Sequence, residues 1–85
     1  MRTSVELSMY PLDKDFVIHI SDYIEGLKSY SDIEVISNTM STQVFGDYDR
    51  VMEVLRIENK KAMEKNVPMV IVSKLINADL SPKQS

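Results

Sequence analysis

The residues of this chain with the most chemical capacity lie in one stretch, Asn38 to Gly46, which reads Asn-Thr-Met-Ser-Thr-Gln-Val-Phe-Gly. It gathers small hydroxyls and two amides between an apolar strand pattern and a helix start, and it holds more of them than a turn requires. These groups donate and accept hydrogen bonds, but they include no acid, base or nucleophile that could transform a ligand. The stretch therefore favours a binding site without turnover. The alternative is a turn whose hydroxyls bond to their own backbone.

Other residues with catalytic capacity are few and isolated in the sequence. The single histidine, His19, falls near the Phe16 and Tyr23 stripe of a predicted helix, and the sequence shows no nucleophile or carboxylate paired with it. We expect a surface or boundary histidine. Because the chain has no cysteine and one histidine, thiolate sites and imidazole clusters are excluded. We expect no catalytic residue, no metal and no cofactor.

Composition limits the class of protein. A chain of 85 residues predicts a single domain, which we assign to residues 1–80, followed by a polar tail over 81–85; the stretch 79–85 is expected to fray. No apolar run reaches the roughly 20 residues that a membrane span needs. The charge of −3, with basic residues dispersed apart from Lys60-Lys61, gives no footprint for nucleic acid. The first residues lack the pattern of a secretory signal, so we expect a cytoplasmic protein without nucleic-acid or membrane partners.

Hydrophobic periodicity predicts six elements that would position the polar stretch. Alternation predicts strands, helical spacing predicts helices, and Asp13 and Asp47 are candidate N-caps. Asn66 and Pro68 are expected to end the second helix. The predicted elements are a strand over 5–10, a helix over 14–28, strands over 33–36 and 42–45, a helix from residue 48, and a strand over 69–76.

This order, β-α-β-β-α-β, predicts an α+β ferredoxin-like fold, in which two helices cover one face of a four-stranded antiparallel sheet. The other face stays open. Both alternating sets of the last strand are largely apolar: Met69, Ile71 and Leu75 in one, and Val70, Val72 and Ile76 in the other. Since large exposed apolar patches are uncommon on monomers, we expect sheet-to-sheet homodimers. The alternative is that the outer residues are only partly exposed.

In this topology the ends of the first two strands and the start of the third meet at one rim. The rim brings together Tyr10, Asn38 and Ser41 to Gln43. Glu6 and Ser8 fall on the open face of a central strand. Glu6 is expected either to stay wet or pair with Lys74 of the neighbouring strand, or to accept hydrogen bonds from a ligand.

Two segments carry a resemblance to a known family. Glu6-Leu7-Ser8-Met9-Tyr10-Pro11-Leu12 and Met40-Ser41-Thr42-Gln43-Val44-Phe45-Gly46, the latter followed by Asp47-Tyr48-Asp49 and Val51-Met52, resemble the YkoF family. The resemblance implies a ferredoxin-like fold, sheet-mediated association, and binding of thiamine or its hydroxymethylpyrimidine moiety. By position it favours Ser41, Thr42 and Gln43 as ligand contacts, with Asn38, Met40 and Ser8 as weaker members. YkoF resembles two such units in tandem, so here two chains would have to associate.

The leading hypothesis is therefore a homodimer that binds thiamine or hydroxymethylpyrimidine without catalysis, for carriage, sensing or delivery. Dimers that pair into tetramers remain open. One rival is an interaction or regulatory module whose open sheet docks a different protein. The other is a small dimeric ferredoxin-like enzyme with His19, Glu6 or Tyr10 in a cleft between sheets.

Overall fold

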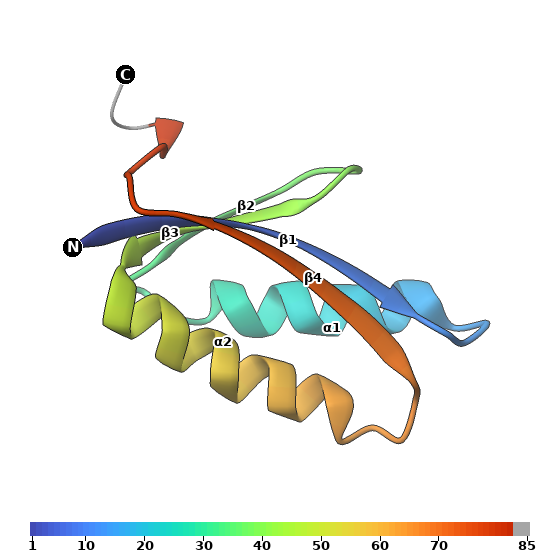
Figure 1. The fold of residues 1–85 in the computed structure, drawn as a ribbon. Coiled ribbons are helices and arrows are strands. Elements are labelled where there is room, and N and C mark those ends of the chain that lie inside the picture. Colours follow the sequence, from blue (N-terminus) through green and yellow to red (C-terminus); the bar gives the residue numbers. More distant parts are fainter. Residues whose placement is uncertain (83–85) are drawn as a thin grey trace.

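The computed structural model describes residues 1–82. The chain forms a four-stranded antiparallel sheet with both helices on one face (Figure 1). The elements are β1 (Arg2–Pro11), α1 (Phe16–Lys28), β2 (Glu34–Ser37), β3 (Thr42–Asp47), α2 (Tyr48–Met63) and β4 (Met69–Ile76). The strands lie in the order β2-β3-β1-β4, and every neighbouring pair is antiparallel. This confirms the predicted α+β ferredoxin-like fold.

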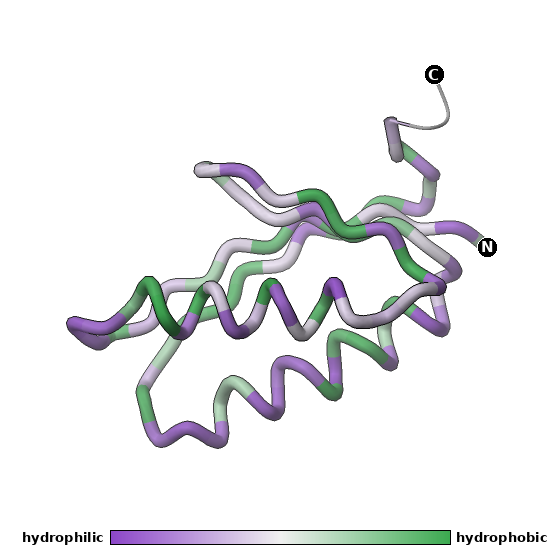
Figure 2. Tube along the Cα trace, turned by 180° about the vertical axis from the view of Figure 1, so that it is seen from behind, coloured by the Kyte–Doolittle hydropathy of each residue, from purple (hydrophilic) through white to green (hydrophobic). Residues whose placement is uncertain are grey.

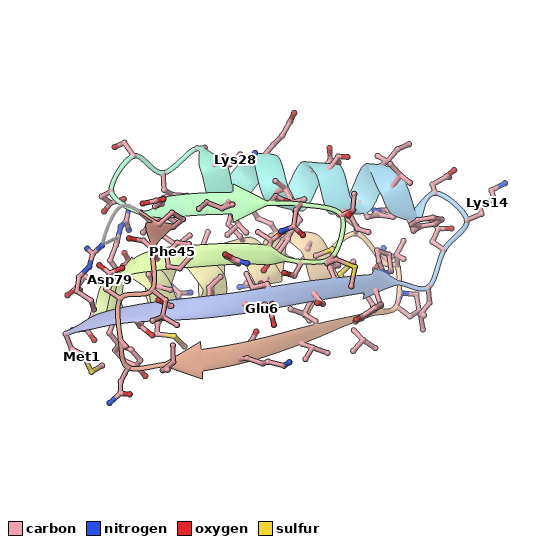
Figure 3. The ribbon with its side chains drawn as sticks, turned by 90° about the horizontal axis from the view of Figure 1, so that it is seen from above. Met1, Glu6, Lys14, Lys28, Phe45 and Asp79 are labelled. Carbon is pink, nitrogen blue, oxygen red and sulfur yellow. The ribbon has the colours of Figure 1, made fainter. Side chains whose placement is uncertain are left out.

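The register of β1 separates the two faces of the sheet. Val5 and Leu7 face the helices and are buried, whereas Glu6 between them points to the open face (Figure 3). The core packs these two strand residues with Val44 of β3 against residues of both helices: Tyr23, Leu27, Val51, Val54 and Leu55. Figure 2 shows hydrophobic and hydrophilic residues alternating along both helices, as expected of helices with one buried side.

The ends of α2 agree with the sequence prediction. The Asp47 carboxylate accepts a hydrogen bond from the Arg50 backbone N–H (3.4 Å), so Asp47 is the predicted N-cap. After the helix, Asn66 adopts φ 61°, a left-handed conformation that asparagine tolerates better than most residues. Pro68 then precedes β4.

The start of α1 differs from the prediction, because Asp13 does not cap this helix. Its carboxylate accepts from the Lys14 N–H (2.9 Å) and contacts His19 Nε2 (2.9 Å), and the helix begins at Phe16 rather than at residue 14. The end of β3 differs as well, since this strand continues through Gly46 to Asp47 instead of ending at residue 45. A Cβ at Gly46 would lie 3.1 Å from Val51 Cγ2 and 3.2 Å from Ile33 Cγ2, so the absence of a side chain permits close packing.

Two tyrosines of the α1 region hold it to α2. The Tyr23 hydroxyl donates to Asn59 Oδ1, and the Tyr30 hydroxyl donates to Glu58 Oε2 (2.7 Å). Glu58 is only 4% exposed and packs against Gly26, where a Cβ would lie 2.1 Å from Glu58 Oε1. The two helices therefore approach closely at this position.

The segment after β4 turns back over the open face. The Ser4 hydroxyl donates to the Ala78 carbonyl (2.7 Å) and accepts from the Leu80 N–H (2.8 Å), while Arg2 pairs with Asp79 (3.0 Å). Beneath this segment Phe45 is 4% exposed, and Figure 3 shows Phe45 and Asp79 at the same end of the sheet. The expectation that residues 79–81 fray is therefore wrong. Residues 83–85 of the predicted tail lie outside the described residues.

Within residues 1–82, neither helix is long and apolar enough to cross a membrane.

Candidate ligand-binding site

A cavity of about 530 Å³ lies between the end of β1, α1 and the β2–β3 turn. Its apolar side comes mainly from Leu7 and Met9 of β1 and from Phe16, Ile20 and Ile24 of α1. Its polar side is the turn 38–42. A volume of this size falls within the usual range for small-molecule sites, which are mostly apolar with a few fixed polar groups.

The structure places five of the six predicted ligand contacts around this cavity: Ser8, Asn38, Met40, Ser41 and Thr42. Tyr10, which was predicted to lie at the same rim, lines the cavity as well. Ser8 borders the cavity although its register opposite Val72 places its side chain on the open face with Glu6.

Asn38 shapes the turn. Its side-chain oxygen accepts from the backbone N–H groups of Met40 (2.8 Å) and Ser41 (3.1 Å), and its own N–H donates to the Ser41 carbonyl (3.1 Å). The turn is thus closed by the amide oxygen of Asn38, whereas the alternative of hydroxyls bonded to their own backbone does not describe Ser41 and Thr42, whose hydroxyls bond to the side chains of Glu6 and Ser37. The amide nitrogen of the same side chain makes no hydrogen bond within residues 1–82 and remains a donor.

Thr42 supplies the hydroxyl best placed to act within the cavity. It is 7% exposed, opposite Leu7 on the helix-facing side of the sheet, and its Oγ1 lies 3.1 Å from Ser37 Oγ. One hydroxyl of this pair donates to the other, so one hydroxyl hydrogen is left for a ligand. A polar group of this kind in an apolar wall fixes the orientation of what binds there.

Gln43 does not lie at the cavity. It stands opposite Glu6 on the open face, with Lys74 on the far side of Glu6, and it borders a second, shallower depression of about 280 Å³. Successive strand residues point to opposite faces, so Thr42 and Gln43 cannot line the same wall. The prediction that both belong to one pocket is corrected by this alternation.

Glu6 has the partner proposed for it. Lys74 Nζ lies 3.7 Å from Glu6 Oε1, and the Ser41 hydroxyl donates to Glu6 Oε2 (3.2 Å). Ser41 thus lines the cavity while its hydroxyl bonds across the sheet edge to a carboxylate of the open face.

The α1 wall was absent from the predicted site. The sequence signal is present, since Phe16, Ile20 and Ile24 recur at helical spacing, but the same spacing is typical of a helix face buried in a core. In the structure the lining residues Phe16, Tyr10 and Met40 are 49%, 55% and 86% exposed. The α1 wall is therefore partly open to solvent at Phe16.

His19 is paired, contrary to the sequence interpretation. Its Nε2 lies 2.9 Å from Asp13 Oδ2, and this hydrogen bond lowers the pKa of Asp13 below its usual value. His19 Nδ1 is buried and has no hydrogen-bond partner in the described part of the chain. The pair does not line the cavity, so it offers no acid or base to a ligand there.

The open face carries exposed apolar residues along the edge strand β4. Val70, Val72 and Ile76 point to this face and are 50%, 44% and 46% exposed. The segment 77–82 covers the end of the sheet near Ser4 and Phe45, and it leaves the end near Tyr10 uncovered. The prediction of an apolar outer set on this strand is confirmed.

Comparisons with known proteins show that the chain shares its fold with several solved structures. A scan against protein-family models and a search of curated proteins find no match to the sequence. Among solved structures, a Streptococcus pneumoniae protein matches with a TM-score of 0.85 at 18% identity, over 99% of this chain and 96% of that one. A hypothetical protein of Methanocaldococcus jannascii matches with a TM-score of 0.79 at 20% identity, over 98% and 90%.

A third solved structure is named for thiamine metabolism. It is the "putative thiamine biosynthesis/salvage protein" of Thermotoga maritima, with a TM-score of 0.84 at 15% identity, over 99% of this chain and 94% of that one. At these identities the likeness establishes the shared ferredoxin-like fold, which is compatible with the YkoF resemblance of the sequence.

Proposed function

We propose that this chain is a cytoplasmic protein that binds thiamine or its hydroxymethylpyrimidine moiety, without chemical turnover, in the cavity between α1 and the β2–β3 turn. The observation that carries the proposal is the cavity itself, about 530 Å³ with an apolar wall and a polar turn, bordered by Ser8, Asn38, Met40, Ser41 and Thr42. The sequence alone predicts these five residues as ligand contacts.

The polar turn suits a nitrogen heterocycle. An aminopyrimidine offers an exocyclic amine as donor and ring nitrogens as acceptors. The Asn38 amide nitrogen and the Ser37–Thr42 hydroxyl pair can meet the ring nitrogens, and a hydroxyl oxygen can accept from the amine. Met40 and Phe16 provide apolar contact for the ring faces.

Binding without turnover is supported by what lines the cavity. Within residues 1–82 its lining holds no histidine, carboxylate or lysine, and of its two tyrosines Tyr23 already donates its hydroxyl to Asn59 Oδ1. Of the residues that the enzyme alternative would use, only Tyr10 lines the cavity within residues 1–82, because the Asp13–His19 pair is separate from it and Glu6 lies on the open face.

The uncovered part of the open face supports the proposed homodimer. Val70, Val72 and Tyr10 expose half of their surface there, and burying a few hundred Å² of apolar surface contributes several kcal/mol at about 25 cal/mol/Å². A second copy would cover this part while the segment 77–82 covers the rest. Sedimentation velocity tests this: dimers or tetramers support it, and monomers over the micromolar range would favour a different protein as the partner.

Titration calorimetry with thiamine and with hydroxymethylpyrimidine tests the ligand. We expect saturable binding to at least one of them. Thr42→Val removes a hydroxyl from the cavity at nearly constant volume, and loss of one neutral hydrogen bond of about 1 kcal/mol should weaken binding about fivefold.

The matched control is Gln43→Ala, one residue along the same strand but on the other face. It should leave the affinity unchanged. No saturable binding of either compound at millimolar concentration would contradict the proposal, and a loss of binding in Gln43→Ala alone would move the site to the open face.

A further inference from the structure

The first relevant feature of the cavity is that no charged side chain lines it within residues 1–82. The polar groups of its lining are hydroxyls and one amide. A phosphate group, by contrast, carries about −1.5 to −2 charges at pH 7 and is normally held by arginine, lysine or several backbone N–H groups. The lining offers no cationic side chain to such a group.

The charged groups next to the cavity are acidic. Asp13 follows the lining residue Leu12 and Asp15 precedes the lining residue Phe16, so two carboxylates flank the first turn of α1. On the opposite side, Glu6 accepts a hydrogen bond from the hydroxyl of Ser41. A bound anion would be repelled from both sides of the cavity.

Three basic side chains near the cavity are turned elsewhere or already paired. Lys14 lies at the tip of the β1–α1 loop and extends away from the body of the protein (Figure 3). Lys74 lies on the open face beside Glu6. His19 contacts the Asp13 carboxylate.

The N-terminus of α1 would by itself favour an anion, because the first backbone N–H groups of a helix have no partner within the helix. Two of the adjacent residues, Asp13 and Asp15, bring carboxylates to this end, and Asp13 already accepts from the Lys14 N–H. Negative charge at this terminus is therefore supplied by the chain itself.

From this arrangement we infer that the cavity discriminates between ligands by their charge. It binds hydroxymethylpyrimidine, which is uncharged, or thiamine, whose thiazolium ring is cationic, and it rejects the phosphate ester of hydroxymethylpyrimidine. The inference rests on the proposed function and narrows it. Burying an anion without a paired cation carries a large desolvation cost, whereas acidic neighbours tolerate a cation. Such a protein would act before phosphorylation of its ligand or after dephosphorylation.

The test is calorimetric titration of the full chain with hydroxymethylpyrimidine and with its monophosphate, under identical buffer and salt. We expect the monophosphate to bind at least about tenfold more weakly. Equal or tighter binding of the monophosphate would overturn the inference and leave the proposed function standing. Absence of binding by both compounds would overturn the proposed function, and this inference with it.

A charge reversal shows whether the acidic flank contributes. Asp15 makes no side-chain cap hydrogen bond, so the Asp15→Lys variant should fold normally. We expect it to reduce the ratio of the affinity for hydroxymethylpyrimidine to the affinity for its monophosphate about threefold. The matched control is Asp49→Lys, which makes the same charge change in the first turn of α2. This helix begins after Asp47, whereas the cavity residue Thr42 lies at the other end of β3. It should leave the ratio unchanged. An equal effect of both variants, or of neither, would contradict the local electrostatic origin.

Discussion

Replacing Tyr23 with phenylalanine should lower the stability of the protein at neutral pH and raise it at high pH. The side chain is 5% exposed, its ring borders the cavity, and its hydroxyl donates to Asn59 Oδ1 of α2. Phenylalanine keeps the ring and removes the hydrogen bond. Because such a bond contributes about 1 kcal/mol net, Tyr23→Phe should lower the free energy of unfolding by about 1 kcal/mol at pH 7.

The high-pH effect follows from the ionisation of the hydroxyl. Burial raises the pKa of Tyr23 well above its usual value, and the charge of Glu58 raises it further. A group whose pKa is raised on folding adds stability that is complete below the unfolded pKa and is lost above it. For tyrosine the loss begins near pH 10 and amounts to about 1.4 kcal/mol per pH unit, or about 2 kcal/mol by pH 11.5.

Phenylalanine has no such proton, so the two stability curves should cross. The loss of about 1 kcal/mol at neutral pH is offset near pH 10.7, above which Tyr23→Phe should be the more stable protein. Urea denaturation of both proteins from pH 7 to about 11.5 measures this difference, in which the other titrating groups cancel. Parallel curves over this range would refute the reasoning, because they would mean that the hydroxyl ionises freely in the folded state.

Three further changes have specific expected outcomes. Asn66→Gly should leave stability within a few tenths of a kcal/mol, whereas Asn66→Ala should lower it by about 1 kcal/mol at the same φ of 61°, measured by urea denaturation. Val72→Glu should shift sedimentation toward monomers, and Lys28→Glu on α1 should not; equal behaviour would exclude the open face as the interface. Asp13 has a pKa lowered by His19, so its contribution to stability should be present above its ordinary pKa and be lost as the pH falls below it; Asp13→Asn should flatten that acid limb, and an unchanged limb would contradict the pairing.

The fold was predictable because its local signals agree with one another. Alternation in β1 and the long apolar run of β4 specify strands, and Asp47 specifies the start of α2. Asn66 and Pro68 mark its end, so the element order followed and with it the sheet topology.

The candidate site was predictable on its polar side and not on its apolar side. The turn 38–42 stands out by composition, but Phe16, Ile20 and Ile24 look the same in a sequence whether they fill a core or line a cavity. Only the space left between α1 and the β2–β3 turn distinguishes the two cases. The position of Gln43 could have been predicted, because the alternation of side chains along a strand places Gln43 and Thr42 on opposite faces of the sheet.

Two contacts could not be predicted from the sequence. The contact of Asp13 with His19 depends on the path of the β1–α1 loop, and the cover over Phe45 depends on where the chain turns after β4. Neither a short loop nor a short polar segment has the periodicity from which such contacts can be inferred.

The most direct test of the central claim is amide chemical-shift mapping of the full chain during titration with hydroxymethylpyrimidine. The account predicts that saturable shifts concentrate at residues 38–42 and at Phe16 to Ile24, with little change along Val70 to Ile76 on the open face. Shifts centred on Glu6, Gln43 and Lys74, or no shifts at millimolar ligand, would contradict it.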